Sequence, residues 1–181
     1  MRVLKKDEMR ILFTKIVKFQ KNFFFMFVKN CIKIFFSFRI IKRKVFFVRN
    51  TVMCRGVLFY KKNLMSLGTC IGNFNRFDCF YFFVTALNFL NSLSNFNFVI
   101  IKNFEENSFI KGKHLKKFQL SSITRQLSSN DGVLVFNENN LLLGFGEIVK
   151  NFSQVQVISK NHIVIINQGD IGKYVRIIPY K

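Results

Sequence analysis

The chain has 181 residues, with 29 lysines and arginines against nine aspartates and glutamates, so its formal net charge is +20 and its pI is about 10.2. Half of the residues are hydrophobic and 17% are aromatic, which excludes a disordered polybasic tail and requires a protein that packs. The length fits one large or two small domains, since domains cluster near roughly 100 to 150 residues.

The cysteines and the apolar stretches exclude several protein classes. The four cysteines form no Cys-x-x-Cys pair and lie among apolar residues, so we expect neither a disulfide scaffold nor a metal site, and no cofactor. Charged residues follow the first methionine at once, which disfavours secretion and favours a reducing compartment. The longest uncharged stretch, between Asp78 and Lys102, turns rich in Asn and Ser, so its apolar part is shorter than the ~20 residues that span a bilayer.

Positive charge is concentrated near the N-terminus. Residues 1–62 hold 17 lysines and arginines against two acids, net +15, whereas residues 63–181 hold 12 against seven, net +5. We therefore expect the N-terminal third to face a polyanion.

The first predicted element is an amphipathic helix. Asp7 and Glu8 lie at its start, where negative charge suits the helix dipole. Apolar residues follow at helical spacing: Met9, Leu12, Phe13, Ile16 and Val17. Strands are then predicted over Phe23–Lys29, Cys31–Arg39 and Val45–Val48. The hairpin turn between the last two holds Lys42, Arg43 and Lys44, a triple charge that a protein tolerates only when it is solvated or bound to phosphate.

The remaining elements alternate around an Asn- and Ser-rich boundary at Asn91–Asn97. Before it, we predict a buried strand over Phe80–Thr85 and a short helix over Ala86–Leu93. After it, we predict a helix within Glu105–Phe118 and a set of short strands: Phe98–Lys102, Gly132–Asn137, Leu141–Ile148, Val155–Ser159, His162–Asn167 and Tyr174–Ile178. Short strands with Gly and Asn turns indicate a small β-barrel.

The residues offer little for catalysis. Neither His114 nor His162 has an evident Cys, Ser or Asp partner, so His114 is expected to be solvated or to contact phosphate, and His162 to be satisfied at a strand edge. The adjacent Glu105 and Glu106 point in different directions on a helix and form no acid and base pair. Asp170 lies between two glycines, which is a turn signature.

Two further patterns concern backbone geometry and RNA. Gly144-Phe145-Gly146 lacks the strand-to-helix step of a dinucleotide site and indicates a strand or bulge with close backbone approach. Basic residues alternate with aromatic ones throughout the chain. Cations release counterions from phosphates and aromatic rings stack on unpaired bases, so this composition suits RNA with single-stranded regions.

Several short motifs together resemble the nuclear import protein seven family, large-subunit ribosome-biogenesis factors with a C-terminal PUA domain. They occur in the family's order at near-family spacing: Met1-Arg2, Arg10, Lys15-Ile16, Ser66 to Cys70 with Gly72, Val84 to Leu87, Gly112 with His114, Ile123-Thr124, Gly132-Val133, Leu143 to Gly146, Gln168, Asp170 to Gly172 and Tyr174 to Arg176. The match covers essentially the whole chain.

The resemblance implies an α+β protein of two domains: an N-terminal α+β domain with an antiparallel sheet over residues 1–95, and a PUA pseudo-β-barrel over residues 96–181. It implies no catalysis. Its expected partners are precursor rRNA, pre-ribosomal particles and other large-subunit assembly factors, with an rRNA methyltransferase as one candidate, and the protein is expected to be a monomer outside the particle. The expected location is the nucleus and nucleolus; the AT-rich codon bias suggests those of a reduced, relic nucleus.

The chain departs from the family pattern in two places. The stretch from Lys117 to Ile123 lacks the glycine-containing turn, and Ser153 to Ser159 carries no charge. We therefore expect RNA affinity to have moved partly to other basic residues. The predicted RNA-binding residues are Lys42, Arg43, Lys44, Lys111, Lys113, Lys116, Lys117, Arg125, Lys150 and Arg176.

Two other function classes stay open. An RNA-modifying enzyme, or its PUA-bearing accessory subunit, would have only Asp7, Glu8 and Asp78 as acids in its first 95 residues. A cationic membrane-surface protein is the other alternative.

Overall fold

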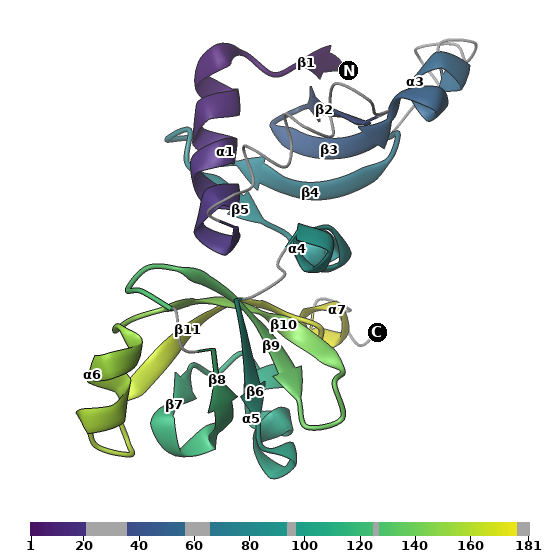
Figure 1. Cartoon of the computed structure of the whole chain (residues 1–181). Helices are drawn as coiled ribbons and strands as arrows, with labels where there is room; N and C mark the ends of the chain where they lie inside the picture. The colour runs from purple at the N-terminus through teal and green to yellow at the C-terminus, as the bar shows by residue number, and fades with distance from the viewer. Residues whose placement is uncertain (21–35, 57–65, 94–96, 125–126, 177–181) are drawn as a thin grey trace. The chain divides into compact units, whose positions relative to one another are not determined.

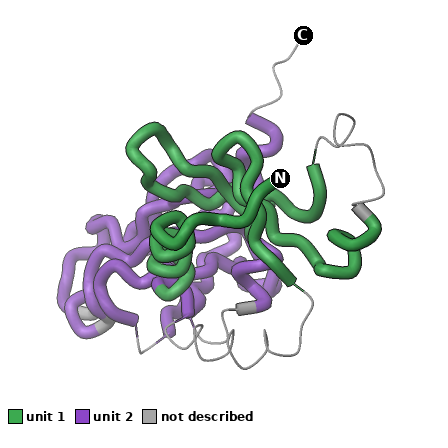
Figure 2. The backbone as a smooth tube through the Cα atoms, turned by 90° about the horizontal axis from the view of Figure 1, so that it is seen from above, with its two compact units in different colours: residues 1–17, 21–86 green, residues 18–20, 87–181 purple. Residues whose placement is uncertain are grey.

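The computed structural model describes residues 1–20, 36–56, 66–93, 97–124 and 127–176. The chain forms two compact units, one of residues 1–17 and 21–86 and one of residues 18–20 and 87–181 (Figure 2). It thus passes from the first unit to the second between Ala86 and Leu87, and the division at residue 95 stays a prediction. None of the described helices is long and apolar enough to cross a membrane.

The first unit is built on a five-stranded antiparallel sheet in the order β1-β2-β3-β4-β5 (Figure 1). In chain order, the elements from the N-terminus to the end of this unit are β1 (Arg2–Val3), α1 (Lys6–Phe19), β2 (Phe36–Ile41), β3 (Lys44–Arg49), α3 (Asn50–Gly56), β4 (Thr69–Phe74), β5 (Phe80–Phe82) and the 3-10 turn η1 (Val84–Ala86). The predicted strands over residues 23–29 and 31–35 lie outside the described residues.

Helix α1 confirms the predicted amphipathic helix. Leu12 and Ile16 are fully buried, and the ring of Phe13 meets that of Phe38 on β2 edge-on, with 6.2 Å between centroids. The Glu8 carboxylate accepts a hydrogen bond from the Lys5 backbone N–H at 2.7 Å, so acidic charge does lie at the start of the helix. The apolar stripe thus places α1 against the sheet, as its spacing predicts.

The predicted hairpin between β2 and β3 is confirmed. Lys42 and Arg43 occupy its turn with φ of 43° and 69°, the left-handed pair of a type I′ turn. The predicted strand over Phe80–Thr85 is too long, because β5 ends at Phe82 and η1 begins at Val84.

The second unit contains a six-stranded sheet in the order β7-β11-β10-β9-β6-β8. Its elements are α4 (Leu87–Leu93), β6 (Phe98–Ile101), η2 (Asn103–Glu105), α5 (Glu106–Ile110), β7 (Leu115–Lys116), η3 (Lys117–Gln119), β8 (Leu120–Ile123), β9 (Gly132–Asn137), β10 (Leu142–Ile148), α6 (Phe152–Val157), β11 (Ile163–Asp170) and α7 (Lys173–Arg176). The edge strands β7 and β8 are separated in the chain by η3 alone, so the sheet curls into a nearly closed barrel (Figure 1). The expected α+β class with a barrel is confirmed.

Close backbone approach shapes the middle of the barrel, as the Gly144-Phe145-Gly146 pattern predicts. Phe145 is fully buried, and the pairing of β10 with β11 shifts register between Phe145 and Gly146. A Cβ at Gly144 would collide with the carbonyl oxygen of Gly169 on β11. Glycine is therefore required where these two strands meet.

Two predicted strands of the second unit are wrong. Residues 152–157 form helix α6, because the Asn151 N–H donates to Gln154 Oε1 at 3.3 Å and thereby begins a helical turn. Residues 173–176 form helix α7 after Gly172, and residues 177–178 lie outside the described part of the chain.

Candidate nucleic-acid interface

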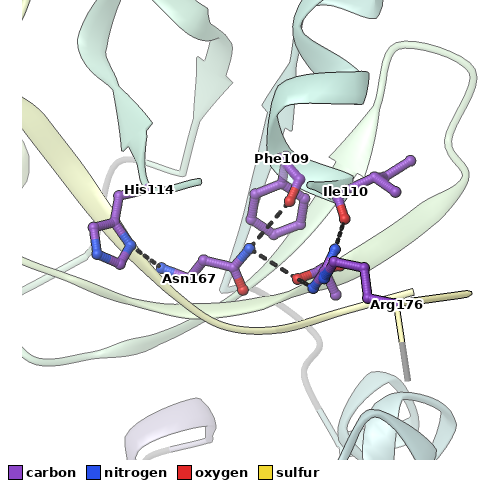
Figure 3. Close-up of polar contacts among 6 residues, drawn as sticks. Phe109, Ile110, His114, Asn167 and Arg176 are labelled. Atoms are coloured by element: carbon purple, nitrogen blue, oxygen red, sulfur yellow. Dashed lines mark hydrogen bonds and ion pairs between the residues drawn. The ribbon is translucent and has the colours of Figure 1, made fainter. Parts of the chain in front are cut away.

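An ion pair between an exposed arginine and a buried carboxylate fixes the C-terminal end of helix α5. Asp170, the last residue of β11, is 2% exposed, and its Oδ2 accepts a hydrogen bond from Arg176 Nη2 at 2.8 Å (Figure 3). Arg176 Nη1 donates to the carbonyl oxygen of Ile110, the last residue of α5. A cation at a helix C-terminus satisfies carbonyl groups that have no intrahelical donor.

Asn167 connects this ion pair to the loop that follows α5. Its Nδ2 donates to the Phe109 carbonyl oxygen and to Asp170 Oδ2, each at 3.2 Å (Figure 3). Its backbone N–H donates to His114 Nδ1 at 3.3 Å. His114 therefore carries its ring proton on Nε2 when neutral, which leaves that N–H available to a ligand.

Gly112 turns the chain from α5 toward β7. Its φ is +89°, and its N–H donates to the Phe109 carbonyl oxygen at 2.8 Å, as in glycine caps that end helices. The turn leaves Lys111, Lys113 and His114 exposed on the loop, with Lys116 exposed on β7. The turn at Gly112 therefore leaves the cations of the segment from Lys111 to His114 exposed to solvent.

This loop borders a surface pocket of about 510 Å³. Gln119 is 5% exposed and fixed on both sides: its Oε1 accepts the Lys116 N–H at 2.7 Å and its Nε2 donates to Glu105 Oε2 at 2.6 Å. The lining combines cationic, polar and apolar groups: Glu105, Ser108, Gly112, Lys113, His114, Lys116, Phe118, Gln119 and Ile163. Ammonium groups beside fixed amide, carboxylate and apolar groups suit a phosphate and its attached base.

Two family models match the chain: the NIP7/UPF0113 pre-PUA domain over residues 1–84 and the UPF0113 PUA domain over residues 97–178. The chain is 34% identical to the "60S ribosome subunit biogenesis protein NIP7 homolog" of Pongo abelii over 176 residues, and 31% identical to that of Dictyostelium discoideum over 177. Each alignment covers 97% of this chain and 97% of the relative. The chain belongs to the NIP7/UPF0113 family.

A solved structure supports the fold of both units of this family member. The conserved PUA domain protein from Thermoplasma acidophilum aligns over 98% of this chain and 99% of its own, with a TM-score of 0.57 and 12% sequence identity. At that identity the likeness shows the fold alone. The pocket lies within the residues that the PUA domain model matches.

The predicted RNA-binding residues of this NIP7/UPF0113 chain fall into several groups. Lys113 and Lys116 line the pocket, and Lys111 lies on the same loop. Lys42, Arg43 and Lys44 lie together at the β2–β3 hairpin of the first unit. Arg125 is outside the described residues.

Three predicted contacts have other surroundings. Lys117 is half-buried and its Nζ donates to the Ile158 carbonyl oxygen at 2.9 Å, away from the pocket lining. Arg176 holds Asp170 and Ile110, and Lys150 is half-buried in the turn between β10 and α6. Their roles in RNA binding stay predictions.

The residues weighed for catalysis are also placed. Glu105 and Glu106 accept from different partners, Gln119 and Asn137, as expected for side chains that point apart. The prediction that His162 has no serine partner is wrong, because Ser159 Oγ lies 2.6 Å from its Nδ1 in an exposed turn. The described residues contain no group of three potential metal ligands, and Cys54, Cys70 and Cys79 are free.

Sequence reasoning missed two features near the interface. Asp170 was interpreted as a turn residue, whereas it ends β11 as a buried partner of Arg176. Phe104 is 74% exposed, and Lys102 Nζ lies 5.8 Å from its ring centroid, beside Glu105 of the pocket. In the sequence, the spacing of Lys102 and Phe104 is the pattern that indicates this contact between a cation and an exposed ring.

Proposed function

We propose that this protein is a non-enzymatic assembly factor of the large ribosomal subunit that binds precursor rRNA through the pocket beside the α5–β7 loop. The observation that carries the proposal is this pocket, which Lys113, His114 and Lys116 line together with the buried Gln119. Relatives that align over 97% of their length are named 60S ribosome subunit biogenesis proteins, which supports the assignment to that process.

The proposed partners follow from this function. The protein binds precursor rRNA within pre-ribosomal particles, contacts other large-subunit assembly factors, an rRNA methyltransferase among them, and is a monomer outside the particle. Its proposed location is the nucleus and nucleolus, here those of a reduced, AT-rich relic nucleus. The net charge of +20 supports a polyanionic partner.

The absence of catalysis is part of the proposal. Asp78, the acid that an RNA-modifying enzyme would need outside the barrel, lies exposed in the β4–β5 turn with φ of 55°. Its backbone N–H donates to the Asn75 carbonyl oxygen at 3.2 Å, which is a turn contact. An exposed carboxylate in a turn lacks the buried setting that tunes a catalytic acid or base. Replacing Asp78 by Asn should therefore leave nucleotide modification in pre-rRNA unchanged.

The cellular test is crosslinking of RNA to the tagged protein in its own cells, with the sedimentation of the protein measured in the same lysate. We expect crosslinks in large-subunit precursor rRNA and sedimentation with pre-ribosomal particles. Crosslinks spread over transfer RNA, or sedimentation as a free protein without RNA, would contradict the proposal.

The molecular test replaces Lys113 and Lys116 by Gln in the full chain. Each phosphate contact contributes about 0.7 to the slope of log affinity against log salt for single strands, so the double variant should lose roughly 1.4. The matched control replaces Lys6 and Arg10 by Gln, since both are exposed on α1 and neither lines this pocket. Equal losses in the two double variants would show that net charge alone, and not the pocket, determines RNA binding.

A further inference from the structure

Two hairpin turns of the first unit form one continuous surface. Arg43, at the β2–β3 turn, donates from Nη1 to the Asn75 carbonyl oxygen at 2.7 Å, and its own carbonyl oxygen accepts from the Phe74 N–H at 2.9 Å. Asn75 begins the turn between β4 and β5. The two turns are thereby tied together, and we call the exposed residues Lys42, Arg43, Lys44, Arg76 and Phe77 the tip surface.

Phe77 projects from a well-ordered turn. Asn75 Oδ1 accepts the N–H groups of Phe77 and Cys79, each at 2.9 Å, and the Asn75 N–H donates to the Cys79 carbonyl oxygen at the same distance. The Phe77 side chain is nevertheless 86% exposed, and no ring partner for it occurs among the described residues. The position therefore contributes little to the core of this unit.

Cations lie on the two turns that carry this ring. The tip surface holds four lysines and arginines, and Asp78 is the single acid in the two turns. The three ion pairs described for the chain involve Arg2, Lys18 and Arg176 as cations, so none draws on the tip surface. Among the described residues, Lys42, Lys44 and Arg76 thus have no acidic partner, whereas Arg43 holds Asn75.

The pairing register extends the surface onto the sheet. Lys44 on β3 lies opposite Asn73 on β4, and Asn73 lies opposite Tyr81 on β5. Residues directly opposite in an antiparallel sheet project from the same face. Tyr81 is 53% exposed, so a second aromatic ring accompanies the cations two strands from Lys44.

We propose that the tip surface binds a single-stranded segment of RNA, with phosphates on Lys42, Lys44 and Arg76 and one unpaired base stacked on Phe77. This inference rests on the proposed function and adds a second RNA contact, on the first unit. Aromatic rings within a cationic surface are the combination that binds single strands, because every base has a face that can stack. A duplex offers no such free face.

An acidic protein would be the competing partner for this charge. Protein interfaces have a core of adjoining apolar side chains that exclude water. Phe77 instead lies between Arg76 and Asp78 in the chain, and the other residues of the tip surface are cations. Exposed rings set among cations match unpaired bases better than they match an apolar protein patch.

The test measures binding of a fluorescent oligouridylate by the full chain with Lys113→Gln and Lys116→Gln already present, so that the tip surface supplies more of the affinity. We expect Phe77→Ala and Phe77→Leu each to bind about tenfold more weakly, since one stacked base contributes about 1–3 kcal/mol. Phe77→Tyr should bind like the parent, because it keeps the aromatic face. Leu141→Ala, at another exposed apolar side chain, is the matched control.

Charge is tested separately by Lys44→Gln and Arg76→Gln in the same parent chain. Each should lower the salt slope by about 0.7, whereas the Phe77 variants leave the slope unchanged. Arg55→Gln, exposed on α3, is the control for loss of one charge in this unit. Thermal melts should be the same for all Phe77 variants, because the ring is outside the core.

Three outcomes would overturn the inference. Parent-like affinity of Phe77→Ala would exclude stacking, and parent-like affinity of Phe77→Leu with loss in Phe77→Ala would indicate apolar packing instead of stacking. If the variants of the tip surface lost a co-purifying acidic protein while their RNA affinity stayed unchanged, the surface would be assigned to that protein. Failure of the unsubstituted chain to bind RNA at any salt concentration would instead refute the proposed function itself.

Discussion

The pocket on the second unit and the tip surface on the first unit present cations in different settings. In the pocket, Lys113 and Lys116 stand beside Gln119, whose amide is held by two hydrogen bonds. On the tip surface, the cations lie on two linked turns that also carry the exposed ring of Phe77. Fixed hydrogen-bonding groups can distinguish base edges, whereas charge and stacking tolerate any base. We therefore expect the pocket to select a sequence and the tip surface to add affinity.

The two regions also differ in the contacts that stabilise their conformation. The pocket loop depends on side chains far apart in the sequence, above all Arg176 and Asp170, whereas Asn75 holds the β4–β5 turn through contacts within that turn. A single substitution should therefore damage the pocket loop more than the tip surface.

Arg176→Leu should lower the free energy of unfolding by about 3 kcal/mol, because it leaves the buried Asp170 carboxylate without its cation. Urea unfolding of the full chain measures the loss. Arg10→Leu, at an exposed arginine of α1, is the control and should change stability little. A loss below about 1 kcal/mol would mean that Asp170 is hydrated without Arg176 and does not hold the loop.

The same variant tests whether Arg176 contacts RNA. If its role is to hold Asp170 and Ile110, the salt slope of RNA binding measured at a temperature where the variant is folded should be unchanged. A drop of about 0.7 would instead assign it a phosphate contact.

Gly112→Ala should cost about 1–2 kcal/mol and weaken RNA binding. Its φ of +89° strains any residue with a Cβ, and the added atom would lie 3.4 Å from Arg176 Nη2. Because Lys113 and His114 follow directly, the strain displaces pocket residues. Gly112→Asn is the control, since asparagine tolerates this region better. If Gly112→Ala and Gly112→Asn lost the same RNA affinity and had the same stability, backbone strain at this position would not be the cause of the loss.

Lys42→Asn should raise stability by about 0.5–1 kcal/mol and still weaken RNA binding. Lys42 has φ of 43°, and type I′ turns favour asparagine over lysine. Thermal unfolding measures the gain, and the salt slope should fall by about 0.7. Lys44→Gln should lower the salt slope of RNA binding by the same amount but leave stability unchanged, because Lys44 begins β3 outside the left-handed turn. An unchanged slope in Lys42→Asn would remove Lys42 from the RNA contact.

The comparison also shows which parts of the molecule local sequence predicts. Helix α1 and the β2–β3 hairpin follow from apolar spacing and charge placement, and both are confirmed. The strand predicted at Val155 fails, because alternating valines suggest β structure, while the contact of Gln154 with Asn151 caps a helix that begins at Phe152 and leaves Val157 87% exposed.

The sites are harder to predict than the elements. Lys113 and Lys116 could be proposed because charge is visible in the sequence, but Asp170 gains its role from Arg176 and from the end of α5, which only the fold brings together. Phe77 is hard to predict for the opposite reason: among 26 phenylalanines, sequence alone does not mark those that the fold leaves exposed.

Glu8→Gln should have the smallest effect and contrasts the exposed ion pair of α1 with the pair of Arg176 and Asp170, whose carboxylate is buried. Arg2 Nη2 lies 2.6 Å from Glu8 Oε1, and this hydrogen bond holds the pKa of Glu8 below its ordinary value. A lowered carboxyl pKa stabilises the fold above the unfolded pKa, roughly 4.3, and the contribution is lost as the pH falls through the folded pKa. The melting temperatures of parent and variant should therefore differ by a small constant amount at pH values above the unfolded pKa, and converge as the pH falls through the lowered pKa of the folded state. A difference as large as that of Arg176→Leu, or one that grows toward acid pH, would show that α1 depends on its ion pair as the pocket loop does.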